Sequence, residues 1–239
     1  MTFRLRPLGC ASVVAGACWA LPAHAAAIAP AGTTDVVRTG IVLALLAVLP
    51  TLLIAMTSFT RIVIVLSMVR HAFGMPETPP SSVLVSLSLF LTMFSMGPVA
   101  GELNRQSVKP YLDGAISLEA AMTRGKAPLQ RFMLAQTRDE DLATIYRVSR
   151  TPLPARPDQV EMAKLVPAFI INELRVAFTI GFVILLPFLL IDLVVSAILL
   201  ALGMMMVPPT TISLPIKLLM FVLIDGWSLI ILGVLGSFR

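Results

Sequence analysis

The stretch from Val176 to Phe238 has at its centre the residues Gly203-Met204-Met205-Met206-Val207-Pro208-Pro209-Thr210-Thr211. An apolar segment lies on each side of this joint, Val176–Leu202 before it and Ile212–Phe238 after it. Each segment has the roughly 20 apolar residues that a helix needs to cross a bilayer core. The joint carries no charge, whereas a water-facing loop between membrane helices is normally polar or basic. We therefore predict a helical hairpin whose tip is buried in protein or lines a passage, because irregular backbone at membrane depth is tolerated only there.

The composition predicts an all-α integral membrane protein. Of the 239 residues, 57% are hydrophobic and only 13% are charged, a balance typical of membrane proteins. The net charge of +5 comes from scattered basic residues, which does not indicate a nucleic-acid partner. The sequence contains no Gly-rich phosphate loop, no Ser/His/Asp set and no paired carboxylates in a plausible cleft. We therefore expect neither an enzyme nor a cofactor.

Residues 1–25 have the pattern of a cleaved secretory signal. The start is basic, the apolar stretch Leu8–Leu21 follows, and Ala23 and Ala25 supply the small residues of a cleavage site. The alternative is an uncleaved first membrane helix, but the short apolar length and the Ala-rich end favour cleavage. Cleavage would remove Cys10 and Cys18, which excludes disulfides, thiolate catalysis and Cys-containing metal sites.

The remaining chain divides into three predicted parts. Residues 26–100 form a first apolar helical hairpin, residues 101–164 a soluble helical insertion, and residues 165–239 a second apolar hairpin with the methionine-rich tip. The insertion holds ten Lys and Arg against eight Asp and Glu, and it contains three predicted helices, Ile116–Thr123, Ala127–Thr137 and Asp139–Arg147. Since a cleaved signal leaves residue 26 outside, we expect the insertion on the periplasmic side.

The first hairpin begins with two short apolar tracts, Ile41–Met56 and Ile62–Val69. Neither tract is comfortably long enough to span a bilayer alone. We predict one long bent helix, broken either at Pro50 or near Arg61.

Five charges lie within or beside the apolar segments: Arg61, Glu173, Asp192, Lys217 and Asp225. A lone charge at the bilayer centre costs about 2.5–3.5 kcal/mol. Asp192 has no basic neighbour within its own helix turn, so it must find a partner elsewhere or be protonated. Lys217 and Asp225 are eight residues apart, which on one helix would place them on the same face but about 12 Å apart. We therefore favour fixed ion pairs with other helices, in this chain or a neighbouring one, over a proton or ion relay.

The three consecutive methionines, Met204 to Met206, allow two interpretations. Methionine is unbranched and polarisable, so it adapts to irregular gaps and to changing partners. The run is either ordinary apolar filler at a helix end or a soft gasket formed by several subunits. The residues alone do not separate the two.

Several long motifs resemble the FliP family of flagellar export-gate proteins. The resemblance is carried by Met56–Leu66, Pro128–Arg138, Val166–Arg175, Leu186–Ser196, Gly203–Met206, Leu214–Lys217 and Asp225–Trp227. It covers nearly the whole chain from Val36 to Phe238.

The resemblance implies a subunit of a helical export-gate assembly in the bacterial inner membrane, at the flagellar basal body. Several copies, a pentamer in the family, would assemble with FliQ and FliR, near FlhB and FlhA, and pass unfolded flagellar proteins. It also implies that Met204, Met205 and Met206 line the closed constriction. The injectisome-type export gate is the alternative branch, disfavoured by the signal at 1–25. An independent proton-coupled transporter using Asp192 and Glu173 is a further alternative.

Overall fold

The computed structural model describes residues 33–75 and 77–238, and every regular element in these ranges is helical. The predicted signal, with Ala23 and Ala25, lies outside the described residues. The chain divides into two compact units, with the boundary between Leu45 and Leu46. Most of the described residues belong to the second unit, and the contacts reported below lie within it.

The first break in the chain lies just before Arg61. Helix α1 (Thr33–Ala55) continues through Pro50, and α2 (Phe59–Ala72) begins after a three-residue turn. Of the two predicted break points, the structure has the one near Arg61. In the first unit, α1 exposes apolar side chains that include Val37 and Ile41.

A sharp bend divides the next apolar segment. Helix α3 ends at Ser95, and after Met96 the chain from Gly97 to Leu112 continues at an angle of 61°. The elements of this region are α3 (Ser81–Ser95), α4 (Gly97–Leu103), the π-helical turn η1 (Asn104–Val108) and α5 (Lys109–Leu112).

The predicted insertion contains α6 (Leu118–Gln136) and α7 (Asp139–Val148). The prediction of two helices in place of α6 was wrong, because the helix continues through Gly125 and Pro128. Gly125 provides space for a neighbour: a Cβ there would lie 3.1 Å from Leu103 and 3.2 Å from the Ser107 hydroxyl. The glycine therefore permits close packing of α6 against α4 and η1 rather than ending the helix.

Helix α8 (Met162–Ala201) is the longest element, with 40 residues. It rises about 60 Å at 1.5 Å per residue, roughly twice the thickness of a bilayer core. Two prolines lie within it, Pro167 and Pro187, and neither ends it. By length and composition α8 could cross a membrane, with a mean hydropathy of 2.9 in its most apolar window.

The last apolar segment is not one helix, contrary to the prediction for Ile212–Phe238. Helices α9 (Pro209–Leu223) and α10 (Gly226–Leu235) meet at 66°. Between them, Asp225 adopts a left-handed conformation with φ 50°, which non-glycine residues rarely occupy. Lys217 and Asp225 therefore lie on different elements, and the prediction that they share a helix face was wrong.

The described residues contain one helix able to span a membrane, or up to three spans if each bent pair is counted as one. The bent pairs are α3 with α4–α5, and α9 with α10. This arrangement confirms the predicted all-α membrane fold with bent apolar helices.

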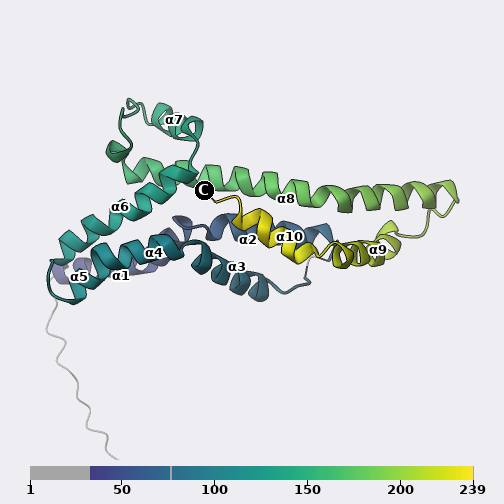
Figure 1. Ribbon diagram of the computed structural model, residues 1–239, viewed down its shortest axis with the longest axis horizontal. Coiled ribbons are helices and arrows are strands. Elements are labelled where there is room, and N and C mark those ends of the chain that lie inside the picture. The colour runs from purple at the N-terminus through teal and green to yellow at the C-terminus, as the bar shows by residue number, and fades with distance from the viewer. Residues whose placement is uncertain (1–32, 76, 239) are drawn as a thin grey trace, which may run out of the picture. The chain divides into compact units, whose positions relative to one another are not determined.

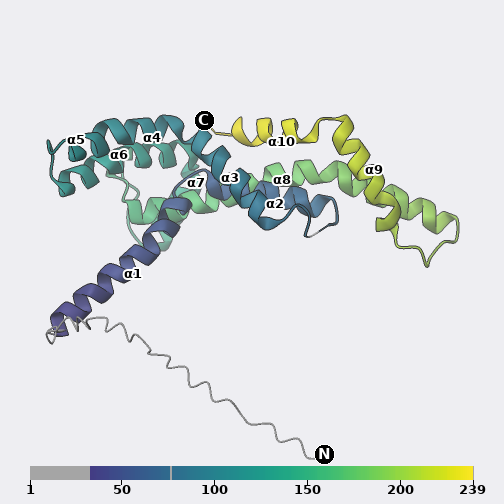
Figure 2. The same cartoon turned by 90° about the horizontal axis from the view of Figure 1, so that it is seen from below.

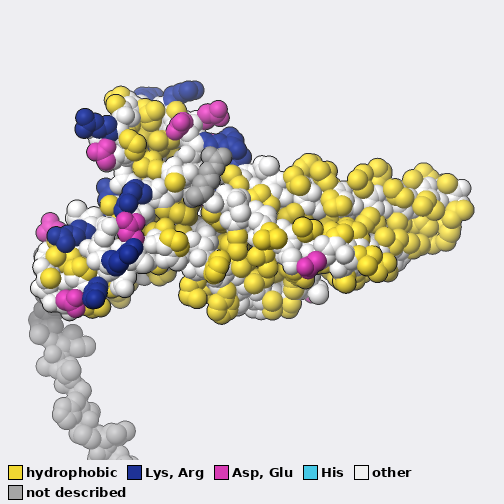
Figure 3. Space-filling model, in the orientation of Figure 1, with side chains coloured by type: hydrophobic (Ala, Val, Ile, Leu, Met, Phe, Trp, Pro, Cys, Tyr) yellow, Lys and Arg dark blue, Asp and Glu magenta, His cyan; other side chains and the backbone are white. Residues whose placement is uncertain are grey.

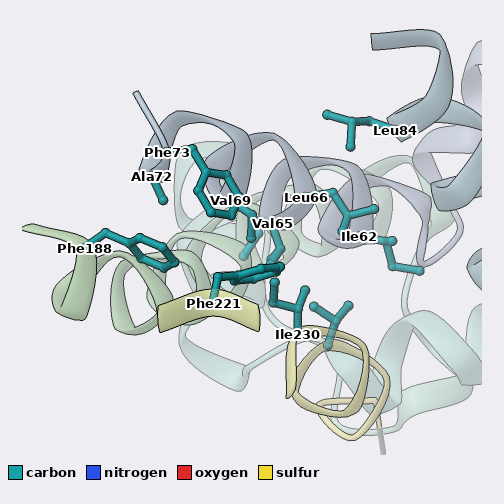
Figure 4. Packing of buried hydrophobic residues seen from close by; sticks show 12 residues of the cluster. Ile62, Val65, Leu66, Val69, Ala72, Phe73, Leu84, Phe188, Phe221 and Ile230 are labelled. Atoms are coloured by element: carbon teal, nitrogen blue, oxygen red, sulfur yellow. The ribbon is translucent and has the colours of Figure 1, made fainter. Parts of the chain in front are cut away.

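The main core lies where α2 packs along α8, with α9 and α10 closing over it (Figures 1 and 2). Three aromatic rings form its centre, with Phe73 lying 5.3 Å from Phe188 and 5.0 Å from Phe221 between ring centroids (Figure 4). A second cluster joins α6, α7 and the beginning of α8 around Met133 and Phe169.

The visible surface of the second unit has two chemically different regions (Figure 3). Lysine, arginine, aspartate and glutamate side chains gather over α4–α7, whereas the surface over the C-terminal half of α8 and over α9 is mainly hydrophobic. The polar region is suited to water, and the apolar region to lipid or to other subunits.

Candidate gate loop and buried ion pairs

The methionine loop follows a well-defined helix end. At the end of α8, Gly203 has φ 73°, and its N–H donates to the carbonyl of Leu200 at 3.0 Å. The N–H of Met204 donates to the carbonyl of Leu199 at 2.9 Å. These two bonds form a Schellman motif, in which glycine adopts the left-handed conformation without strain. The loop therefore starts from a fixed point at the end of a long helix.

The three methionine side chains project from that point. Their exposed fractions are 43% for Met204, 79% for Met205 and 95% for Met206. Side chains this exposed contribute little to the packing of their own chain. They are therefore available to contact other molecules.

Arg61 and Glu173 form a buried ion pair between α2 and α8. Arg61 is 1% exposed and Glu173 is fully buried. The Arg61 Nε donates to Glu173 Oε2 at 2.8 Å, and a second guanidinium nitrogen contacts Oε1. This is the bidentate arrangement in which arginine binds a carboxylate most strongly.

The Arg61 guanidinium also holds two other parts of the chain. Its Nη1 donates to the carbonyl and hydroxyl oxygens of Ser237 at 2.9 and 2.8 Å, and its Nη2 donates to Gln136 Oε1 at 3.3 Å. The guanidinium carbon lies 4.0 Å from the centre of the Phe238 ring. Beside it, Asn172 Nδ2 donates to the Gln136 carbonyl at 2.6 Å. One arginine thus connects α2, α6, α8 and the segment after α10.

A second ion pair joins α8 to α9. Lys217 is 3% exposed, and its Nζ lies 2.6 Å from Asp192 Oδ2 and 3.1 Å from the Ala72 carbonyl. Since Ala72 ends α2, the ammonium connects three helices. This contact fixes α9 against α8 on the side of the hairpin that leads to the methionine loop.

Asp225 differs from the other four charges. It is exposed at the junction of α9 and α10. Within residues 33–75 and 77–238 its carboxylate makes neither a salt bridge nor a side-chain hydrogen bond. The structure therefore pairs Arg61 with Glu173 and Lys217 with Asp192, and leaves Asp225 unpaired in the described chain.

Sequence reasoning missed a third interhelical pair. Arg175 on α8 donates to Asp141 Oδ1 on α7 at 2.6 Å, and the Asp141 side chain is only 4% exposed. Asp141 lies in the first turn of its helix, where a carboxylate is common, so its position gave no sign of burial. The roles of Gln136 and Ser237 beside Arg61 had no local signal either.

A polar cavity of about 670 Å³ opens beside the Arg61 centre, lined partly by Asn172, Gln136 and the start of α7. Among the described residues, no group of three His, Cys, Asp or Glu side chains is placed to hold a metal ion. The arrangement offers fixed ion pairs and an exposed apolar loop rather than a reaction centre.

Residues 42–234 match the sequence model of the FliP family. This chain belongs to the FliP family. It is 50% identical over 202 residues to the flagellar biosynthetic protein FliP of Pectobacterium carotovorum, covering 84% of this chain and 78% of that protein. It is 45% identical over 209 residues to FliP of Bacillus subtilis, covering 87% and 95%, and 41% identical over 207 residues to FliP of Aquifex aeolicus, covering 86% and 87%.

The region shared with the FliP family includes the methionine loop and all five charges singled out from the sequence. Ser237 and Phe238, which contact Arg61, lie just beyond the matched range. The predicted signal at 1–25 also lies outside it.

Proposed function

We propose that this chain is the channel and gate subunit of the flagellar type III export apparatus, through which unfolded flagellar proteins cross the inner membrane. As a FliP family member, the chain is a component of the flagellar export apparatus and not an enzyme. The observation that carries the gate role is the exposed, uncharged methionine loop at the end of α8.

The gate requires a seal that yields to a passing polypeptide. Methionine has three rotatable side-chain bonds and no branch, so a group of methionines fills an irregular gap and can rearrange. Met204, Met205 and Met206 of several copies would form such a gasket around a narrow pore. Gly203 supports this role, because its Schellman motif gives every copy the same loop start.

The exposed apolar surface supports assembly with other subunits. Only 17% of the most apolar window of α8 is buried within the chain, and contiguous apolar surface of this kind is covered by lipid or protein. We propose a homo-oligomer, a pentamer by resemblance to the family, that binds FliQ and FliR and lies near FlhB and FlhA. Residues 101–164 would form its periplasmic part; the charged surface over α4–α7 supports their contact with water (Figure 3), and the predicted cleaved signal supports the periplasmic side.

The gasket is tested by replacing Met204, Met205 and Met206 together with alanine. In cells that express the variant with FliQ and FliR, we expect ions and small solutes to leak through the gate while flagellar substrates are still exported. The matched control is Met93→Ala with Met122→Ala, two methionines that are 69% and 70% exposed elsewhere on the chain. If the gate assembles with the triple variant and its ion permeability is unchanged, the gasket is contradicted.

The transporter alternative is less well supported by the geometry. A relay carboxylate must be free to gain and lose a proton, yet Glu173 and Asp192 are each held by a cation of the same chain. The chain reconstituted alone should therefore transport nothing. Transport by the chain alone, abolished by Asp192→Asn, would support the transporter instead.

A further inference from the structure

Among the described residues, two opposite charges in or beside the apolar helices, Arg70 and Asp225, have no ion-pair partner. The cations of α2, α3, α8, α9 and α10 are Arg61, Arg70, Lys164, Arg175 and Lys217. Four of them form ion pairs, and Arg70 is the one that, among the residues described, does not. Asp225, at the α9–α10 junction, is likewise without a partner in the described chain.

Asp225 stands in an apolar surface. Its neighbours in sequence are strongly exposed hydrophobic residues: Val222 is 74% exposed, Leu223 is 75% and Trp227 is 40%. A surface of this kind is covered by lipid or protein in the membrane, where an unpaired carboxylate is unfavourable. The left-handed backbone at Asp225 fixes the position of this carboxylate at the bend. The site therefore calls for a cation that the described part of the chain does not place beside it.

Arg70 has the capacity to supply that cation. Its Nη1 donates to the Ser81 hydroxyl at 2.8 Å, and among the described residues the guanidinium has no carboxylate partner. A guanidinium remains charged at all relevant pH values and binds carboxylates with two nitrogens at once.

The positions of the two charges suit association between copies. The C-terminal end of α2 and the α9–α10 junction lie at a similar level along the longest axis (Figures 1 and 2). In Figure 2, the α9–α10 junction lies on one side of α8 and the C-terminal end of α2 lies toward the other, whereas α3 crosses the level of α8. Copies placed side by side with parallel long axes would thus bring the α9–α10 junction of one copy to the end of α2 in the next. Such a contact uses different surfaces on the two copies and can repeat around a ring.

We infer that Asp225 of one copy forms an ion pair with Arg70 of the adjacent copy. This inference rests on the proposed homo-oligomer, and it names two residues that would hold neighbouring copies together. The pair would neutralise both unpartnered charges of the apolar helices in a single contact.

Disulfide trapping tests the contact directly. Arg70→Cys and Asp225→Cys are introduced into the full chain carrying Cys10→Ser and Cys18→Ser, expressed with FliQ and FliR, and oxidised in membranes. We expect a ladder of dimers and larger species from the double variant. When the two single variants are co-expressed with tags of different size, we expect only dimers that contain one chain of each kind. The control pair, Arg124→Cys with Asp225→Cys, places one thiol on α6 in the charged region and should give no ladder.

Charge reversal tests whether the contact is an ion pair. Asp225→Arg should place two cations together, which lowers the yield of the native oligomer by at least about tenfold. Arg70→Asp should have a similar effect, and the double reversal should restore most of the yield. Failure of the double reversal to restore any yield would contradict the ion pair.

Two trapping outcomes would overturn the inference without contradicting the proposed gate. One is a normal oligomer that forms no cross-link between positions 70 and 225. The other is a cross-link to FliQ or FliR in place of a second copy. A cross-link within one chain, seen as a monomer of altered mobility, would also overturn it. Absence of an oligomer in the unsubstituted protein is a different result, which would contradict the proposed assembly itself.

Discussion

The Arg61–Glu173 pair allows the sharpest prediction about stability. Glu173→Gln keeps the shape of the side chain but removes the charge that neutralises a guanidinium only 1% exposed. Removing one partner of a buried pair costs about 3–5 kcal/mol. We expect a value near the lower end, about 3 kcal/mol, because the glutamine oxygen still accepts one bond and Arg61 keeps Ser237 and Gln136.

This cost converts into a measurable loss of thermal stability. In a protein of this size, 1 kcal/mol shifts the melting temperature by about 2–4 °C. Glu173→Gln should therefore lower the melting temperature by about 6–12 °C. The assay is thermal unfolding of the detergent-solubilised chain at a fixed scan rate, since membrane proteins often unfold irreversibly.

The matched control breaks an ion pair that is not buried. Glu102 accepts from Arg131 at 2.6 Å, with side chains 30% and 61% exposed. Glu102→Gln should cost about 0–1 kcal/mol, because water screens and hydrates both groups. Equal shifts for Glu173→Gln and Glu102→Gln would refute the reasoning. A second check is Arg61→Leu with Glu173→Leu, which should cost less than the sum of the two single changes, since no charge is left unpaired.

Three further changes test other parts of the account. Asp192→Leu should lower stability by about 3 kcal/mol, more than Lys217→Met does, because it leaves unpaired an ammonium that is more deeply buried than the Asp192 carboxylate. The melting temperatures of the two variants decide this. Gly226→Ala should cost about 1–3 kcal/mol, because its Cβ would lie 2.2 Å from the packed Phe221 ring. Gly233→Ala is the control, because no atom lies within 4 Å of the new Cβ. It should be neutral or stabilise α10 by up to about 1 kcal/mol. Equal melting temperatures for Gly226→Ala and Gly233→Ala would contradict the packing argument. Asp141→Asn should shift the melting temperature less than Glu173→Gln, since its partner Arg175 is 44% exposed.

Hydropathy and local patterns were sufficient to predict the helical membrane fold and the methionine joint. Of the five charges singled out, the structure pairs four and leaves Asp225 without a partner among the described residues; charges in apolar helices are recognisable without a structure. The identity of the partners could not be predicted. Glu173 lies 112 residues from Arg61, and nothing in either local sequence indicates which helices pack together.

The predicted helix boundaries were wrong at two glycines, Gly125 and Gly226. The predicted break between Thr123 and Ala127 was wrong, because the missing side chain of Gly125 allows α6 to pack closely against Ser107 and does not end the helix. The opposite error occurred at the Asp225–Gly226 dipeptide. This is a typical turn signal, and the bend between α9 and α10 could have been found there despite the apolar residues on both sides.

We propose that this FliP family member works as one of several copies around a gated channel. The most direct test is the native mass of the detergent-solubilised protein, expressed alone and then together with FliQ and FliR. A discrete oligomer that retains both partners is the predicted result, and it makes a ring of Met204–Met206 loops geometrically possible. A stable monomer that binds neither partner would contradict the account, because one methionine loop cannot close a channel.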